Sequence, residues 1–326
     1  MTFRMKFLRN LVLGIVGLLI AGLGSASAVD YPTRPVRWIV GYPAGGAADI
    51  VARIMGQWLS ERLGQSVIIE NKSGAGTNIA TQAVIAAPSD GYTLLWVSPA
   101  NAINATLYEA LPFNFLRDTV PVAGLVRFAL VLEVNPKLPA TTVAELIAYA
   151  KANPGQLSMA SFGVGTSSHL AGELFKTMTG ARMVHVPYRG SAPAVTDLIA
   201  GLTHIMFDNL TSSLALIQSG AVRVLAVTTE AQSGMLPGIP TLAETLPGFE
   251  ASGWSGIVAP RGTPPEIVER LHREVDAGLA NPNIGARLAE VGSTLMPMTP
   301  AQFGAFLAAE TEKWSKVVNS SGAKAE

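Results

Sequence analysis

The 326-residue chain contains no cysteine. This absence excludes disulfide bonds, thiolate zinc sites, a cysteine nucleophile and a lipid-modified cysteine. A chain of this size can bury a sufficient core without disulfides. Charged residues are also scarce, at 14% of the chain, and 23 basic residues balance 23 acidic ones. Because the chain has no block of basic residues, we expect no nucleic-acid partner.

The common enzyme motifs are missing as well. The sequence has no G-x-S-x-G elbow, no H-E-x-x-H pair and no G-x-x-x-x-G-K-[ST] loop. The glycine pairs Gly74/Gly76 and Gly163/Gly165 lack the third glycine of a dinucleotide fingerprint. The four histidines show no metal-ligand spacing. We therefore expect no enzyme, no cofactor and no metal, and a hydrolase using Ser167 and His169 is the enzymatic alternative.

The N-terminus has the pattern of a secretory signal. Arg4, Lys6 and Arg9 precede the apolar run 11–23, and Ala26-Ser27-Ala28 is a small-x-small cleavage site. The run is shorter than the roughly 20 residues of a membrane-spanning helix. We predict cleavage after Ala28 and a soluble periplasmic protein without a lipid anchor, the alternative being an uncleaved anchor. Removing residues 1–28 leaves 20 basic and 23 acidic residues, a mildly acidic chain.

The remaining chain alternates between strand and helix patterns. Val36–Val40 is a short apolar run typical of a buried strand, and from Ile50 apolar residues return at helical spacing. Similar pairs continue to about Val227, and Thr142 with Glu145 forms a capping box. This alternation predicts an α/β fold with parallel sheets covered by helices on both faces.

The length after cleavage favours two lobes over a single sheet. No glycine/serine linker marks a boundary, but two extended stretches, 120–135 and 249–259, suggest that the chain crosses between lobes twice. We predict lobe one as residues 29–126 plus 254–326 and lobe two as residues 127–253.

Three glycine-containing loops stand before predicted helices. They are Pro43–Gly46, Gly74–Asn78 and Ser161–His169. Glycine lets the backbone turn sharply and approach a guest, and the N–H groups of the following helix attract anions. Each loop alone is equally explained as an ordinary structural cap. Together they predict capture of a small anion.

Several side chains near these loops allow two interpretations. Asp49 would repel a bound anion, so we expect it, with Arg53, to brace the first loop. Arg189 either binds a carboxylate or is a solvated surface residue. Asp208 either accepts from a ligand or caps the next helix. We expect His169 to order its loop by hydrogen bonding.

The chain resembles a known family through motifs that occur in a fixed order. They are Tyr42-Pro43-Ala44-Gly45-Gly46, Leu63-Gly64-Gln65, Gly74-Ala75-Gly76, Asp90-Gly91-Tyr92-Thr93-Leu94-Leu95, Gly163-Val164-Gly165-Thr166, Val186-Pro187-Tyr188-Arg189-Gly190 and Phe207-Asp208. This set is similar to the Bug-type receptors of tripartite tricarboxylate transporters. The resemblance covers essentially the whole chain after residue 28.

The resemblance implies a two-lobed periplasmic binding protein fold of type II, with two crossover segments and a ligand in the cleft between the lobes. It implies a small organic carboxylate held largely by main-chain groups, and transient contact with integral membrane transport subunits. We expect a monomer. The predicted ligand contacts are Tyr42, Ala44, Gly45, Gly46, Thr77, Ser98, Phe162, Gly163, Gly165, Thr166, Ser167, Arg189 and Asp208.

Three positions depart from the family pattern. Ala44 stands where a second proline is frequent, Thr77 where a third glycine is common, and Arg189 where lysine is more usual. None of these changes removes a main-chain donor, but Thr77 leaves the identity of the ligand open. The same sequence would also serve a sensor subunit that passes its occupied form to a signalling partner.

Overall fold

The computed structural model describes residues 30–321 and 323–325, so the predicted leader lies outside the described residues. The strands are β1 (Val36–Val40), β2 (Val67–Asn71), β3 (Thr93–Val97), β4 (Thr119–Val134), β5 (Ser158–Ser161), β6 (Val184–Pro187), β7 (Ile205–Asn209), β8 (Arg223–Val227), β9 (Ser252–Pro260) and β10 (Ser293–Met298).

Helices alternate with these strands through most of the chain. The α-helices are α2 (Ala47–Leu63), α3 (Asn78–Ile85), α4 (Pro99–Leu107), α5 (Phe115–Asp118), α6 (Val143–Ala152), α7 (Ser167–Thr179), α8 (Ser191–Ala200), α9 (Leu210–Gln218), α10 (Pro265–Leu279), α11 (Pro282–Glu290) and α12 (Pro300–Ser321). Two short 3-10 helices are η1 (Ala75–Thr77) and η2 (Leu242–Glu244). The predicted α/β alternation is confirmed.

The strands form one sheet in the order β2-β1-β3-β9-β4-β7-β5-β6, with β8 and β10 also paired to β4. Strands β1, β2 and β3 run parallel, as do β5, β6 and β7. The prediction of parallel pairing is wrong for the middle of the sheet, where β4 and β9 pair antiparallel with each other and with their neighbours.

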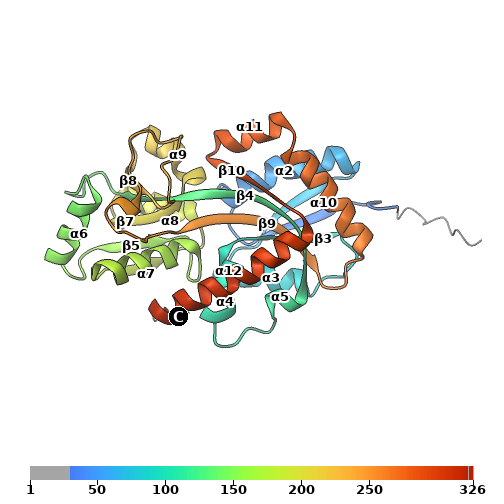
Figure 1. The fold of residues 1–326 in the computed structure, drawn as a ribbon, viewed down its shortest axis with the longest axis horizontal. Coiled ribbons are helices and arrows are strands. Elements are labelled where there is room, and N and C mark those ends of the chain that lie inside the picture. The colour runs from blue at the N-terminus through green and yellow to red at the C-terminus, as the bar shows by residue number, and fades with distance from the viewer. Residues whose placement is uncertain (1–29, 322, 326) are drawn as a thin grey trace, which may run out of the picture. The chain divides into compact units, whose positions relative to one another are not determined.

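Two long strands connect the two parallel groups. β4 and β9 run side by side from the group that carries α6 to α9 to the group that carries α2, α3 and α10 (Figure 1). The first part of β4 pairs with β9 and β10, and its last five residues pair with β7 and β8. These strands coincide with the two stretches predicted to cross between lobes, and the lobe boundaries stay a prediction.

Each parallel group has its own hydrophobic core. One core surrounds β5 and β7 and includes Leu132, Phe175 and Phe207, all fully buried. The other surrounds β1 and β3 and includes Trp254 and Phe303. Parallel strands buried on both faces are rich in apolar residues, which explains the continuous apolar runs in the sequence. The loops at the ends of these strands line the cavities described next.

Candidate functional site: two cavities that share an aromatic wall

Two neighbouring cavities lie among the loops predicted to bind a ligand. Tyr42 and Phe162 line both cavities, and their rings meet edge to face with centroids 6.1 Å apart. The first cavity has a volume of about 30 Å³ and the second about 230 Å³. The first cavity is therefore much the smaller of the two.

Five helices begin at the first cavity. The residues at their starts that line it are Ala47 of α2, Pro99 of α4, Ser167 of α7, Ser191 of α8 and Asn209, the N-cap of α9. A helix N-terminus carries a partial positive charge and N–H groups without a helical acceptor. Five of them around one cavity create a site for an anion without any charged side chain.

Some of these backbone N–H groups have no hydrogen-bond acceptor within the described residues. The Ala47 N–H donates to Ser212 Oγ at 3.0 Å. Within the described part of the chain, no acceptor is found for the N–H groups of Ala48 and Ser167. Both residues line the cavity, so their N–H groups are available to a carboxylate oxygen.

The remaining wall of the first cavity is apolar. Trp96, Phe128 and Pro43 line it together with the shared aromatic pair, and none of its lining residues is charged. The Tyr42 hydroxyl lies 3.0 Å from Ser98 Oγ. Burial raises the pKa of Tyr42 to about 12, so its hydroxyl keeps its proton at neutral pH. The cavity thus suits a carboxylate on a carbon skeleton.

The second cavity contains one charged side chain, Arg189. Thr77, Gly163 and Tyr108 also line this cavity, and Arg189 is exposed at its edge. Among the described residues, none forms an ion pair or hydrogen bond with the Arg189 guanidinium. A guanidinium without a partner at a cavity edge is suited to a carboxylate.

Thr77 has an unusual backbone and an unsatisfied hydroxyl. Its φ angle is +79°, in the left-handed region that β-branched residues rarely adopt. Its side chain is buried, and Oγ1 has no hydrogen-bond partner among the described residues. The Thr77 methyl faces Gly41, where an added Cβ would lie 2.9 Å from it. The structure therefore holds a strained residue with a free hydroxyl at the wall of the second cavity.

Asp49 connects the first loop to its surroundings. It accepts hydrogen bonds from Gly45 N–H, Arg53 Nε and Asn71 Nδ2, at 3.0, 2.9 and 3.1 Å. Burial alone would raise the pKa of Asp49, but the bonds from Arg53, Gly45 and Asn71 outweigh it and hold the pKa below its ordinary value. Asp49 is therefore an anion that contacts the loop rather than either cavity.

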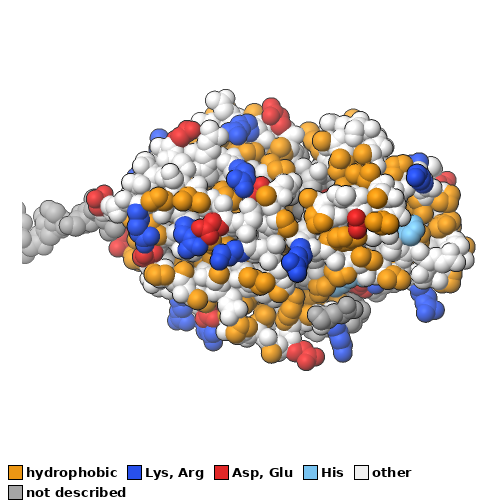
Figure 2. Space-filling view, turned by 180° about the vertical axis from the view of Figure 1, so that it is seen from behind, with side chains coloured by type: hydrophobic (Ala, Val, Ile, Leu, Met, Phe, Trp, Pro, Cys, Tyr) orange, Lys and Arg blue, Asp and Glu red, His pale blue; other side chains and the backbone are white. Residues whose placement is uncertain are grey.

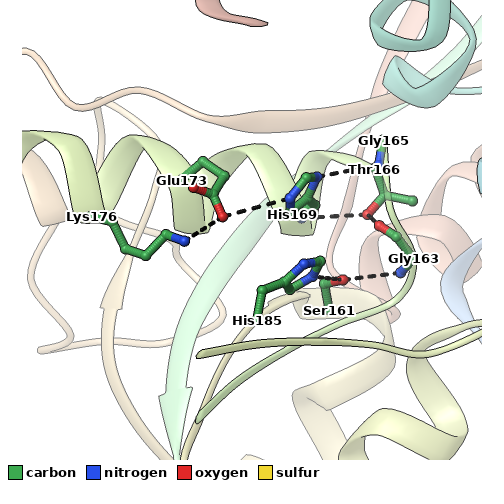
Figure 3. A network of polar contacts seen from close by, with 8 residues as sticks. All are labelled: Ser161, Gly163, Gly165, Thr166, His169, Glu173, Lys176 and His185. Carbon is green, nitrogen blue, oxygen red and sulfur yellow. Dashed lines mark hydrogen bonds and ion pairs between the residues drawn. The ribbon is translucent and has the colours of Figure 1, made fainter. Parts of the chain in front are cut away.

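A stacked histidine pair lies behind the third loop (Figure 3). The rings of His169 and His185 are 4.2 Å apart and nearly parallel. The Gly165 N–H donates to His169 Nδ1, and the Gly163 N–H donates to Ser161 Oγ, which lies 2.7 Å from His185 Nε2. The N–H groups of both glycines are thus used within the protein and do not face a ligand.

Burial keeps both histidines neutral. Burial, with a contribution from Lys176, lowers the pKa of His169 to about 4. Burial, with a contribution from His169, lowers the pKa of His185 to about 3. Because neutral His169 accepts at Nδ1, its proton is on Nε2, the nitrogen that lies 3.6 Å from Glu173.

The structure brings most of the predicted ligand contacts to the two cavities. The lining residues that were predicted are Tyr42, Gly46, Thr77, Ser98, Phe162, Gly163, Ser167 and Arg189. Ala44 and Gly45 are exposed outside both linings, and Gly165, Thr166 and Asp208 are buried behind them. Thr166 Oγ1 donates to Gly163 O, which places its hydroxyl within the loop.

Sequence reasoning missed several lining residues. They include Pro43, Trp96, Phe128, Ser191, Ala192 and Asn209. Asn209 is the most informative, because its Oδ1 is buried without a partner in the described structure. A signal existed in the sequence, since Asn209 and Ser98 each stand where a strand ends and a helix begins. Trp96 and Phe128 gave no such signal, because aromatic residues in strands are usually core.

The two parallel groups touch each other around these cavities. A Cβ added at Gly165 would lie 2.0 Å from Asn104 Oδ1, and one at Gly190 would lie 2.5 Å from Pro43 Cδ. Asn104 belongs to α4, whereas Gly165 precedes α7. These close approaches need glycine and describe a closed arrangement of the loops.

The described residues contain no cluster of histidine, aspartate or glutamate able to hold a metal ion. No helix within the described ranges is sufficiently long and apolar to cross a bilayer. Basic and acidic side chains are interspersed on the molecular face drawn in Figure 2. The two cavities are thus lined by helix N-termini and apolar side chains, with Arg189 as the single charged lining residue.

The mixed α/β fold, with helix N-termini around a cavity, is that of periplasmic binding proteins. The comparisons with known proteins agree with this class and narrow it. Residues 51–323 match the family model described as "Tripartite tricarboxylate transporter family receptor". The chain belongs to this family, whose members are binding proteins rather than enzymes.

Individual relatives support the assignment. Protein BugT of Bordetella pertussis is 39% identical over 319 residues, which cover 96% of this chain and 98% of BugT. A structure of Rpa4515 from R. palustris with adipate is 39% identical, with a TM-score of 0.87, covering 90% of this chain and 98% of that one.

MatC from Rhodopseudomonas palustris with bound malate is 28% identical, with a TM-score of 0.85, covering 88% of this chain and all of that one. The fold and the family expected from the sequence motifs are confirmed.

Proposed function

We propose that this protein is a periplasmic receptor that captures a small dicarboxylate and delivers it to the membrane subunits of a tripartite transporter. The observation that carries the proposal is the convergence of five helix N-termini on a cavity without a charged side chain. Adipate and malate, each with two carboxylates, are the acids named for two solved relatives.

The two cavities suggest how such an acid is held. One carboxylate binds at the first cavity, to the N–H groups at the starts of α2 and α7. The carbon skeleton passes the Tyr42–Phe162 pair, which lines both cavities. The second carboxylate binds Arg189, and the Thr77 hydroxyl donates to it. No acidic side chain lines either cavity, so the ammonium group of an amino acid lacks a counter-charge there.

Closure follows from the contacts between the two parallel groups around the cavities. Gly165 lies against Asn104 and Gly190 lies against Pro43, so the loops of the two groups approach each other closely. The acid therefore enters when the two parallel groups separate, with bending at β4 and β9, and the groups close over it. The ligand supplies the preference for the closed form only if it binds that form more tightly.

A thermal-shift screen against mono-, di- and tricarboxylates, aromatic acids and acidic amino acids tests the proposal. We expect dicarboxylates to raise the midpoint of unfolding, by about 4–5 °C at 100 times the dissociation constant. Adipate and hexanoate form the informative pair, because they share six carbons and differ by one carboxylate. No shift with any carboxylate would overturn the proposal.

An arginine substitution tests the second carboxylate. We expect Arg189→Ala to weaken adipate binding about tenfold or more while changing hexanoate binding little, measured by calorimetry. Arg182→Ala is the matched control, because Arg182 is exposed and lines neither cavity. Equal losses for both acids in Arg189→Ala would contradict the assigned role of Arg189.

A further inference from the structure

Two fully buried carboxyl groups lie behind the first cavity. Asp208 on β7 pairs with Val131 on β4, and Glu133 pairs with Met206. Because side chains alternate along a strand, Glu133 and Val131 point to the same face of the sheet. Asp208 and Glu133 are therefore diagonal neighbours on one face, within reach of each other.

The two groups differ in their hydrogen bonding. Asp208 Oδ2 accepts from Ser191 Oγ at 2.5 Å and from Ser213 Oγ at 3.0 Å, and its Oδ1 accepts from Asn209 N–H at 2.8 Å. Glu133 is equally buried, and neither of its carboxyl oxygens has a hydrogen bond of normal geometry; the nearby Ser213 hydroxyl, which acts to lower the pKa of Glu133, donates to Asp208. An ionised Glu133 in such a place would be very costly.

Charged residues on the neighbouring elements do not compensate this pair. α9 contains no charged residue. Arg223 on β8 donates to the carbonyl groups of Pro136, Leu138 and Ala140. Asp197 on α8 accepts from the Tyr188 hydroxyl.

The remaining charged residues nearby are also engaged elsewhere. Arg127 of β4 lies with its guanidinium over the ring of Phe306. On α7, Glu173 interacts with Lys176 at 2.6 Å and with His169 at 3.6 Å. The described structure thus offers neither acid a cation, and neighbouring carboxyl groups in a buried site disfavour each other's ionisation.

The electrostatics of the pair agree with one retained proton. Burial raises the pKa of Asp208 to about 6. Burial, followed by the charge of Asp208, raises the pKa of Glu133 well above its usual value. Glu133, which is buried without a counter-charge, therefore favours its protonated form, whereas Asp208 is mostly ionised at neutral pH with a pKa not far below it.

The pair is directly connected to the ligand cavity. Ser191 and Asn209, which both donate to Asp208, line the first cavity. The buried Asn209 Oδ1 has no partner in the described structure. A carboxylate in the cavity would therefore lie one side chain away from Asp208, and its negative charge would oppose the ionisation of Asp208.

We propose that the receptor takes up its carboxylate together with one proton, which is bound by Asp208 next to the already protonated Glu133. This inference rests on the proposed function, because the anion in the first cavity supplies the charge that draws the proton. The proton comes from water, and no other bond forms or breaks. Asp208 is thereby a positioning residue. It does not touch the ligand, and its protonation responds to the ligand's charge through Ser191 and Asn209.

The inference predicts the sign of the pH dependence. A bound anion raises the pKa of Asp208 above its value in the free protein. Between these two values, binding takes up a proton, and the affinity falls as the pH rises, by at most tenfold per pH unit. Well below pH 6, Asp208 is already protonated in the free protein, and the affinity no longer changes through this group.

Calorimetry of adipate binding between pH 6 and 8.5, in two buffers with different ionisation enthalpies, tests the inference. We expect uptake of up to one proton per adipate near pH 7 to 8, and no uptake in Asp208→Asn. Asp90→Asn is the control, since Asp90 forms a surface ion pair with Arg34. Carbon-13 NMR of labelled aspartate carboxyls in the ligand-free protein, with Asp208 assigned by its substitution, gives the pKa directly.

The outcomes separate the two proposals. Adipate binding without proton uptake, or an Asp208 pKa at its ordinary value, overturns the inference and leaves the receptor function intact. A raised Asp208 pKa with no binding of any carboxylate overturns the receptor function and, with it, the coupling to a ligand. Binding with proton uptake that disappears in Asp208→Asn supports both.

Discussion

Thr77 is the residue whose local conformation costs the most at this site. A side chain in the left-handed region loses about 1–2 kcal/mol relative to the ordinary conformations, and a buried hydroxyl without a partner adds to this. Such a cost persists where the surroundings enforce the conformation, and it occurs often at ligand sites. Thr77 thus combines strain with a free polar group at a cavity wall.

Substitution of Thr77 by glycine should stabilise the ligand-free protein. We expect Thr77→Gly to raise the free energy of unfolding by about 1 kcal/mol, because the relief of strain exceeds the entropy cost of glycine. Urea denaturation measures this change. Ala75→Gly is the control at φ +47°, where the smaller, exposed side chain should give a smaller gain. A loss of stability in Thr77→Gly would contradict this account.

His169 makes stability depend on pH in the acid range. Its pKa is lowered to about 4 in the folded protein, so the unfolded chain binds more protons between pH 4 and 6.5. The contribution of His169 to the free energy of unfolding is fully present above pH 6.5. It falls as the pH drops, by an amount of the order of 3 kcal/mol.

We expect His169→Asn, which keeps an acceptor for the Gly165 N–H, to reduce the loss of stability between pH 6.5 and 4. Thermal unfolding across this range measures it. Asp208 and Glu133 act in the opposite direction there, because their folded pKa values are raised. His272→Asn, a substitution of a different histidine, is measured in parallel as the control. An equal effect in both variants would refute the assignment to His169.

At the scale of elements, the start of α2 depends on one buried carboxylate. Asp49 accepts from the first loop, from its own helix and from the end of β2. We expect Asp49→Ala to lower the free energy of unfolding by about 2 kcal/mol, because three donors lose a charged acceptor. Glu70→Ala is the comparison, since Glu70 pairs with Arg37 but is more exposed. Similar small losses in both variants would show that Asp49 does not brace the loop.

The sequence predicted the elements whose local signals agree with the structure. Gly64 ends α2 with a φ of +70°, and Thr142 caps α6 by accepting from Glu145 N–H, as the sequence pattern indicated. The antiparallel pairing of β4 and β9 was not predicted, because strand direction depends on contacts distant in sequence rather than on local pattern. The helix α4 was missed for a related reason, since Pro99–Leu107 is nearly all buried and shows little amphipathic alternation.

The loops that supply main-chain N–H groups to the candidate site could be predicted from the sequence. The side chains that line its walls were harder to predict. Several glycine loops before helices together favour an anion site, so the sequence pointed to Gly46, Gly163 and Ser167, which line the cavities. Trp96 and Phe128 line the first cavity from strands whose sequence pattern indicated only hydrophobic core. Ser191 and Asn209 reach the same cavity from separate helices, and only the tertiary fold brings these helices together.

At the scale of the whole molecule, the close approach of the α7 loop to α4 allows a test of the proposed closure. We expect Gly165→Ala to weaken adipate binding at least tenfold, because its methyl group would collide with Asn104. Gly155→Ala is a matched control, since both glycines have a φ of +77° and nothing lies near the added methyl of Gly155. Calorimetry with both variants compares them, and equal affinities would indicate that this contact is not needed for binding.

The convergence of helix N-termini has a consequence for how this protein can change over evolutionary time. Main-chain N–H groups persist through almost any side-chain substitution, so mutation does not easily remove the proposed binding of one carboxylate. Residues at the cavity walls, such as Thr77, Phe128 and Arg189, can vary while these main-chain groups stay the same. A gene duplicate could therefore acquire a new organic acid through a few wall substitutions, without first losing the ability to bind any acid.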